Sequence, residues 1–138
     1  MKKREPVSHI MTKNVHSVLE TADLRTVAGI FKSENIHHLP IMRGNEIVGI
    51  ISSSDINRLS INTLYDNQDG GLDAILDSLT LGHLMTQNPV VVETTDSILE
   101  IAEVFANANF HALPVVEGQE LKGIVTTKDI IKYFLGQA

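Results

Sequence analysis

Residues 37–55 read HHLPIMRGNEIVGIISSSD, and residues 111–129 read HALPVVEGQELKGIVTTKD. The two stretches share a His, a Leu-Pro pair, two glycines and a final Asp at matching places. The match extends outward, because residues 7–59 align with residues 81–133 at a constant offset of 74, without a gap and with 18 of 53 positions identical. Chance does not hold such a register, so the chain contains an internal duplication.

Both copies carry the same order of predicted elements, β-α-β-β-α, behind a short lead-in turn. The first helix of each copy is predicted from apolar residues at i, i+3, i+4 and i+7. These residues are Leu24, Val27, Ala28 and Phe31 in one copy and Ile98, Ile101, Ala102 and Phe105 in the other. The lead-in turns are expected at 7–11 and 81–85, and the strands at 16–18, 39–42, 47–51, 90–92, 113–116 and 121–125. Turns at Gly44 and Gly118 join the paired strands, and the final helices start near Ser53 and Thr127.

The repeat is too small to form a stable domain by itself. Units of about fifty residues bury little surface and are marginally stable. We therefore expect an α+β fold in which the small mixed sheets of the two repeats pack face to face with pseudo-twofold symmetry. Residues 1–59 form the first predicted repeat and 81–138 the second, in one compact module with a linker at 60–80.

The linker is acidic and ends in an amphipathic pattern. Residues 60–80 hold four aspartates and no Lys or Arg. Asp69-Gly70-Gly71 is typical of a turn. Apolar residues at helical spacing follow, which predicts a short helix. They are Leu72, Ile75, Leu76 and Leu79. The stripe suits packing on the chain's own core or on another subunit, and the pattern does not separate the two.

Composition narrows the class of protein. The 138 residues are 43% hydrophobic, carry a formal net charge of −6 and contain no cysteine. Nucleic-acid binders rely on basic patches, and the basic cluster here is limited to residues 1–4, so we expect no nucleic-acid binding. Disulfides, thiolate catalysis and Cys-ligated zinc are excluded. No apolar run approaches the roughly 18 residues of a membrane helix, and no signal-peptide region is recognisable, so we expect a cytoplasmic protein without membrane contact.

The junction between the last strand and the last helix of each copy carries a hydroxyl residue and an acid three residues later. The pairs are Ser52 with Asp55 and Thr126 with Asp129. A capping box explains such a pair, and this is its commoner use. The same helix N-terminus also suits a phosphate, and the acid suits the diol of a ribose. The residues alone leave both interpretations open.

The duplicated pattern resembles the CBS (cystathionine β-synthase) domain family, and the pair of repeats resembles a Bateman module. The matching elements are His9-Ile10-Met11-Thr12, His37-His38-Leu39-Pro40-Ile41 and Gly49 to Asp55, with their counterparts His83-Leu84-Met85-Thr86, His111-Ala112-Leu113-Pro114-Val115 and Gly123 to Asp129. The resemblance implies a site for an adenosine-containing ligand in the cleft between the repeats. It places the ribose on the acids and the hydroxyl or basic residues near ribose or phosphate. These residues are Asp55, Ser52 and Ser54 in one repeat and Asp129, Thr126 and Lys128 in the other.

The resemblance also gives the histidines a place at the ligand. In adenylate-sensing relatives a His before the Leu-Pro pair faces the phosphates, which implies that role for His37 and His111. His38 accompanies the first, whereas Ala112 accompanies the second, so the two sites are unequal. Adenine is expected near His16 and Val90. As alternatives from the residues alone, His37 and His111 are ordinary rim residues that titrate near neutrality.

Three functions follow as hypotheses. The first is a regulatory module that binds AMP, ADP, ATP, NAD or S-adenosylmethionine and signals by a change of conformation. The second is a ligand-free scaffold for dimerisation and partner docking. The third, enzyme activity, is not expected because no P-loop or metal-ligating motif is present. We expect no metal site and no required cofactor, since none of the six histidines forms an i, i+4 pair. The resemblance implies a homodimer, and the protein effector is not identified.

Overall fold

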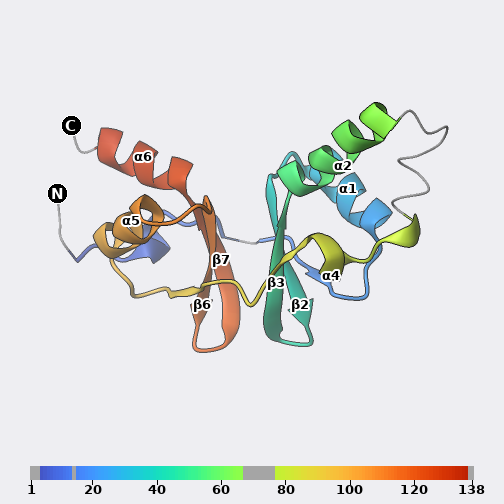
Figure 1. Cartoon of the computed structure of the whole chain (residues 1–138). Coiled ribbons are helices and arrows are strands. Elements are labelled where there is room, and N and C mark those ends of the chain that lie inside the picture. The colour runs from blue at the N-terminus through green and yellow to red at the C-terminus, as the bar shows by residue number, and fades with distance from the viewer. Residues whose placement is uncertain (1–3, 14, 67–76, 137–138) are drawn as a thin grey trace. The chain divides into compact units, whose positions relative to one another are not determined.

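The computed structural model describes residues 4–13, 15–66 and 77–136, and over 60–66 it describes only the course of the backbone (Figure 1). The chain forms two compact units. The first-repeat unit consists of His16–Asn88. The second-repeat unit joins the chain up to Val15 with the chain from Pro89 onward. In the described residues, no helix has the length and apolar character that a bilayer crossing requires.

The elements of the two units follow the predicted order. The first-repeat unit contains β1 (Val18–Leu19), α1 (Leu24–Glu34), β2 (His38–Arg43), β3 (Glu46–Ser52), α2 (Ser53–Asp66), α4 (Leu81–Leu84) and β4 (Thr86–Gln87). The second-repeat unit contains η1 (Val7–His9), β5 (Val92–Glu93), α5 (Ile98–Ala106), β6 (Ala112–Glu117), β7 (Glu120–Thr126) and α6 (Thr127–Gly136). The α+β class and the two repeats, each with a small mixed sheet plus helices, are confirmed.

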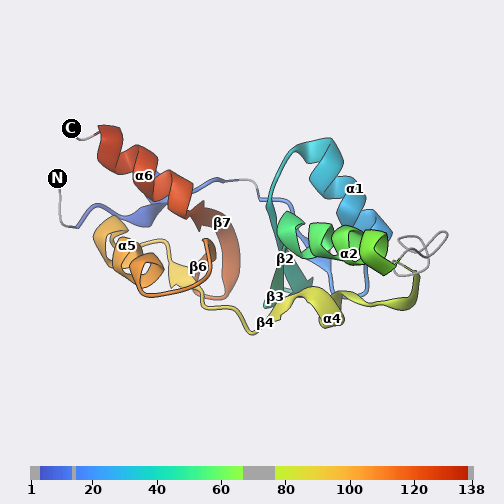
Figure 2. The ribbon, with the colours of Figure 1, turned by 45° about the horizontal axis from the view of Figure 1, so that its top comes forward.

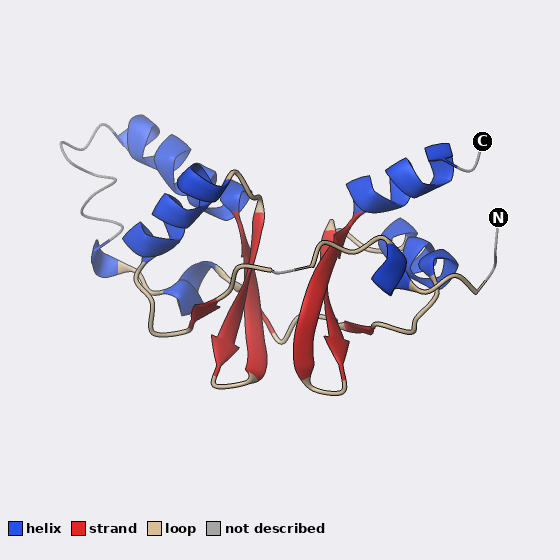
Figure 3. Cartoon of the chain, turned by 180° about the vertical axis from the view of Figure 1, so that it is seen from behind, coloured by secondary structure: helices blue, strands red, loops and turns tan. Residues whose placement is uncertain are grey.

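Each sheet is built around one hairpin (Figure 3). In the first-repeat unit the strand order is β1-β2-β3-β4, with β1 parallel to β2 and the other pairs antiparallel. In the second-repeat unit the order is β5-β6-β7. Gly44 and Gly118 turn the two hairpins with φ of 59° and 65°, a left-handed conformation that favours glycine. The predicted hairpin strands and turns are confirmed.

Helices α1 and α2 lie side by side on one face of their sheet (Figures 1 and 2). Asp23 begins α1 as its N-cap, because its Oδ1 accepts a hydrogen bond of 2.7 Å from the Thr26 amide. The apolar stripe then faces the hairpin and builds the core of the unit. The buried residues of this core come from α1, the hairpin and α4; they are Leu24, Val27, Phe31, Leu39, Ile41, Ile51 and Leu81. The second-repeat unit has an equivalent core around α5 and α6.

The first strands are shorter and later than the sequence predicts. Strand β1 starts at Val18 and β5 at Val92, whereas strands were predicted at 16–18 and 90–92. Each strand forms only where the chain runs parallel to the hairpin, with Val18 opposite Ile41 and Val92 opposite Val115. Before β5, Val90 and Val91 have β propensity but no strand beside them.

The lead-in segments, residues 7–12 and 81–87, are exchanged between the repeats. Val7 is fully buried in the core of the second-repeat unit, and Leu81 is fully buried in that of the first-repeat unit. Thr12 forms an isolated antiparallel bridge with Ile124 of β7, and Thr86 in β4 pairs with Ile50 of β3. Each compact unit is therefore completed by the lead-in segment of the other repeat.

The exchange explains a glycine in each hairpin. A Cβ on Gly123 would lie 2.7 Å from the backbone oxygen of Thr12, and a Cβ on Gly49 would lie 3.1 Å from that of Thr86. Both glycines have ordinary backbone angles, so space, and not conformation, requires them. The repeated glycine lets the lead-in segment approach the strand.

The linker region contains more helix than was assigned to it. Helix α2 starts at the strand–helix junction and continues without a break to Asp66, well past residue 60. The predicted turn at Asp69–Gly71 and most of the predicted Leu72–Leu79 stripe lie outside the described residues. Within the described part, Leu79 packs on the core of the first-repeat unit, and Asp77 pairs with Arg25 at 3.0 Å.

Candidate functional site

The two strand–helix junctions form reciprocal capping boxes. In the first-repeat unit the Ser52 amide donates to Asp55 Oδ2 at 2.8 Å, and the Asp55 amide donates to Ser52 Oγ at 3.2 Å. In the second-repeat unit the Thr126 and Asp129 pair makes the same two bonds at 2.9 and 3.2 Å. The capping interpretation is confirmed at both junctions, and it fixes each carboxylate at the start of a helix.

Capping occupies only part of each carboxylate. A carboxylate has two oxygens with about four lone-pair sites, and the box uses Oδ2 for one bond. In the first-repeat unit the Arg58 guanidinium donates to the second oxygen, Oδ1 of Asp55. Arg58 is 70% exposed and Asp55 is 15% exposed, so the pair lies at the surface edge of the junction. The i, i+3 spacing of this pair was a signal that the sequence reasoning did not use.

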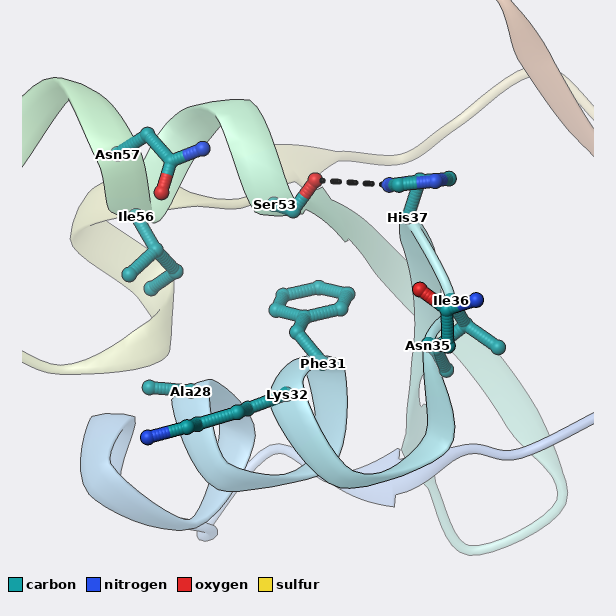
Figure 4. A pocket seen from close by; sticks show the side chains of 9 residues that line it. All are labelled: Ala28, Phe31, Lys32, Asn35, Ile36, His37, Ser53, Ile56 and Asn57. Carbon is teal, nitrogen blue, oxygen red and sulfur yellow. Dashed lines mark hydrogen bonds between the residues drawn. The ribbon is translucent and has the colours of Figure 1, made fainter.

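The two histidines before the Leu-Pro pairs lie directly against these helix starts. The His37 carbonyl accepts a hydrogen bond of 2.9 Å from the Ser53 amide, and the His111 carbonyl accepts one of 3.0 Å from the Thr127 amide. The His37 side chain is exposed, and its Nδ1 lies 3.4 Å from Ser53 Oγ (Figure 4). The structure therefore brings each predicted histidine to the start of the helix that carries the acid of its own repeat.

The remaining predicted residues have different settings. Ser54 and Lys128 are exposed in the first turn of α2 and α6. His38 starts β2 and lies opposite Ser52 in the hairpin, which keeps it beside the junction. His16 lies 3.4 Å from Glu34, at the end of α1. Val90 precedes β5 and is 52% exposed.

A pocket of about 290 Å³ lies beside the first junction, between α1 and α2 (Figure 4). Its lining residues are Ala28, Phe31, Lys32, Asn35, Ile36, His37, Ser53, Ile56 and Asn57. Of these, only His37 was predicted from the sequence to contact a ligand. The other polar residues come from the end of one helix and the start of another, and sequence spacing does not show that these meet.

Both repeats match a known family model. The model of the CBS domain matches residues 7–62 and 81–136. The chain belongs to the CBS domain family. The match covers each hairpin, both junctions and the exchanged lead-in segments, so the resemblance stated from the sequence is confirmed.

Relatives of this CBS pair include longer proteins. Protein MJ1225 of Methanocaldococcus jannaschii is 28% identical over 132 residues, which cover 94% of this chain and 47% of that protein. A homoserine O-acetyltransferase of Methanococcus vannielii is 27% identical over 126 residues, which cover 90% of this chain and 24% of that enzyme. The chain thus spans about half of one curated relative and about a quarter of the other.

A solved structure of similar size has the same fold. The CBS domain pair of protein MJ0100, solved in complex with 5′-methylthioadenosine and S-adenosyl-L-methionine, is 27% identical and superposes with a TM-score of 0.78. The alignment covers 96% of this chain and 98% of that one. The likeness therefore extends over both repeats.

Proposed function

We propose that this CBS pair is a regulatory module that binds an adenosine-containing ligand and signals through a change of conformation. The candidate ligands are AMP, ADP, ATP, NAD and S-adenosylmethionine. The observation that carries the proposal is the likeness over nearly the full chain to the MJ0100 pair, whose structure contains two adenosine compounds. The strand–helix junction with its acid is also intact in both repeats of this chain.

In this proposal the carboxylates cap their helices with Oδ2 and accept ribose hydroxyls with their remaining lone pairs. The helix N-terminus and a neighbouring histidine would face the phosphate or another polar group. We expect the junction of Asp129 to contribute more than that of Asp55, because Arg58 already donates to Asp55. Lys128 also adds a cation where the first repeat has Ser54.

The second candidate is a scaffold that dimerises and docks partners without any ligand. The capping boxes favour it, because both acids have a structural role that needs no sugar or phosphate. A homodimer and a protein effector are compatible with either candidate. The two differ in whether a small molecule stabilises the folded chain.

Thermal and urea unfolding of the full chain with each of the five candidate ligands separates the two. A ligand that binds only the folded state adds about 2.7 kcal/mol of stability at a hundredfold excess over its Kd. Regulation further requires two states with different affinity, so the radius of gyration with and without the bound ligand is measured by solution scattering. No stabilisation by any of the five ligands would leave the scaffold as the function.

Asp129→Ala and Asp55→Ala test the assignment of the acids. The matched control is Asp23→Ala, which removes the cap of α1 away from both junctions. Each substitution is expected to cost about 1 kcal/mol of folding stability through the lost cap. Only the two junction variants are expected to weaken ligand binding, by tenfold or more at Asp129. Equal ligand affinity in all three variants would show that the acids only cap.

A further inference from the structure

The pocket between α1 and α2 is more polar than the aligned positions of the second repeat. Three of its positions align with apolar residues there: Lys32 with Ala106, Ile36 with Phe110 and Asn57 with Ile131. In the second repeat Phe110 packs edge-on against Phe105, with ring centroids 6.3 Å apart. In the first repeat the smaller Ile36 leaves the ring of Phe31 on the wall of the pocket (Figure 4).

The lining combines an apolar floor with donors and positive charge. Figure 4 shows Phe31 between the helices, with Ile56 and Asn57 on the α2 side and Lys32 on the α1 side. None of the nine lining residues is an acid. Helix α2 begins at Ser53, so its helix dipole adds positive potential on the α2 side of the pocket. An acid-free wall with a lysine is a local exception in a chain whose net charge is −6.

We propose that this pocket binds a small organic anion. Its apolar group lies on Phe31 and Ile56, and its phosphate or carboxylate group is held by Lys32. The volume of about 290 Å³ lies just below the range of about 300–1,000 Å³ typical of pockets for drug-sized ligands. The size therefore selects a molecule smaller than a dinucleotide, with one apolar group and one anionic group.

The site is separate from the proposed adenosine function. Phe31, Lys32, Ile56 and Asn57 have no role in that function, and the pocket lies entirely within the first-repeat unit. His37 and Ser53 are the lining residues that also belong to the candidate junction. The two proposals can therefore fail independently.

The test is a titration of the full chain with phenyl phosphate, phenylacetate and the neutral benzyl alcohol, followed by amide chemical shifts. Both anions are expected to shift the amides at the end of α1 and the start of α2 saturably. Benzyl alcohol is expected to bind about tenfold more weakly, because it lacks the charge-assisted hydrogen bonds. The tighter of the two anions identifies whether phosphate or carboxylate is preferred.

Variants that copy the second repeat make the test specific. Lys32→Ala should raise the Kd of phenyl phosphate about fivefold, as expected for an exposed charge pair, and leave the Kd of benzyl alcohol unchanged. Lys122→Ala, which removes an equal charge in the second-repeat unit, should change neither. Ile36→Phe should abolish saturable shifts by filling the pocket. Asn57→Ile changes an exposed position and should weaken phenyl phosphate binding without disturbing the core.

Three results would overturn the proposal. The first is the absence of saturable shifts at the pocket with either anion. The second is equal affinity for benzyl alcohol and the anions, which would leave no role for Lys32. The third is an equal effect of Lys32→Ala and Lys122→Ala, which would reduce the binding to attraction by the general charge of the surface.

Discussion

Replacing Gly123 with alanine tests the exchange of the lead-in segments. The added Cβ would lie 2.7 Å from the Thr12 backbone oxygen and 2.7 Å from Met11 Sδ. The methionine side chain is able to rotate away, but the backbone oxygen belongs to a bridge with two hydrogen bonds. These run between Thr12 and Ile124 at 2.9 and 3.0 Å. The lead-in segment must therefore move away from β7.

The cost follows from overpacking and weakened hydrogen bonds. Overpacking a filled site costs about 1–3 kcal/mol, and each backbone hydrogen bond contributes about 0.5–1.5 kcal/mol net. Since the bonds lengthen and are not lost, we expect Gly123→Ala to lower the free energy of unfolding by about 2 kcal/mol. Gly49→Ala should cost less, because the nearest backbone oxygen there is 3.1 Å away.

Gly29→Ala is a control for which the opposite change in the free energy of unfolding is expected. Gly29 lies inside α1, and a Cβ there would meet nothing within 4 Å. Alanine is favoured over glycine in a helix interior by about 1 kcal/mol, so this variant should be more stable than the wild type.

Urea unfolding followed by circular dichroism gives the stability of each variant, and amide exchange gives the stability of each unit separately. The amide hydrogen-exchange measurement is needed because a chain with two compact units need not unfold in one step. The Gly123→Ala change should accelerate exchange in β7 most. The reasoning is refuted if Gly123→Ala is as stable as the wild type while Gly29→Ala shows its expected gain.

Three further predictions concern other parts of the chain. Leu81→Ala should cost about 2–5 kcal/mol of stability, because Leu81 is fully buried, and its largest amide shifts should lie in α1 and β2 and not in β6 and β7. Arg43→Gln should raise the pKa of Glu20 toward 4.5, because hydrogen bonds of 2.6 and 2.9 Å from Arg43 hold that pKa down, as a carboxyl NMR titration would show. A lowered carboxyl pKa stabilises the fold above the unfolded value of 4.5 and loses this effect as the pH falls through the folded pKa, so the variant should lose less stability on acidification. Glu5→Gln should lower the pKa of Tyr133 while leaving it above 10.0, because burial raises this pKa first and the hydrogen bond to Glu5 raises it further, which an alkaline absorbance titration measures.

Much of the fold could be predicted because its signals are local. The i, i+3, i+4, i+7 stripe places α1 and α5, and the Gly44 and Gly118 turns place both hairpins. The ends of the elements depend on neighbours that are distant in the chain. Strands β1 and β5 thus begin two residues later than predicted, where the hairpin offers a partner.

The exchange of the lead-in segments could not be predicted, because the duplication itself hides it. Both hairpins present the same Gly-Ile pair to a lead-in segment, at Gly49 and at Gly123. Both lead-in segments carry the same Met-Thr pair, so either one matches either hairpin. Which hairpin each lead-in segment pairs with depends on the path of the connecting chain, and that path leaves no pattern in the residues.

One part of the candidate site could likewise be predicted from the sequence, and another part could not. The junction acids were predictable, since the hydroxyl residue and the acid are three residues apart and make contact within one helical turn. The pocket was not, because Lys32 and Asn57 lie on separate helices. The comparison of aligned positions, Ile36 against Phe110, becomes informative only once the ring of Phe31 is seen in the pocket wall.

The exchange also indicates where a regulatory signal would act. Thr12 pairs with β7 in one unit and Val18 pairs with β2 in the other, so only residues 13–17 connect them. Similarly, residues 88–91 connect β4 of the first-repeat unit to β5 of the second. Any change in the relation of the two units must be taken up in these two connections. His16 and Val90, the residues that the resemblance places near adenine, belong to these connections. In the proposed function, a ligand beside either one would act on a segment that a conformational change has to alter.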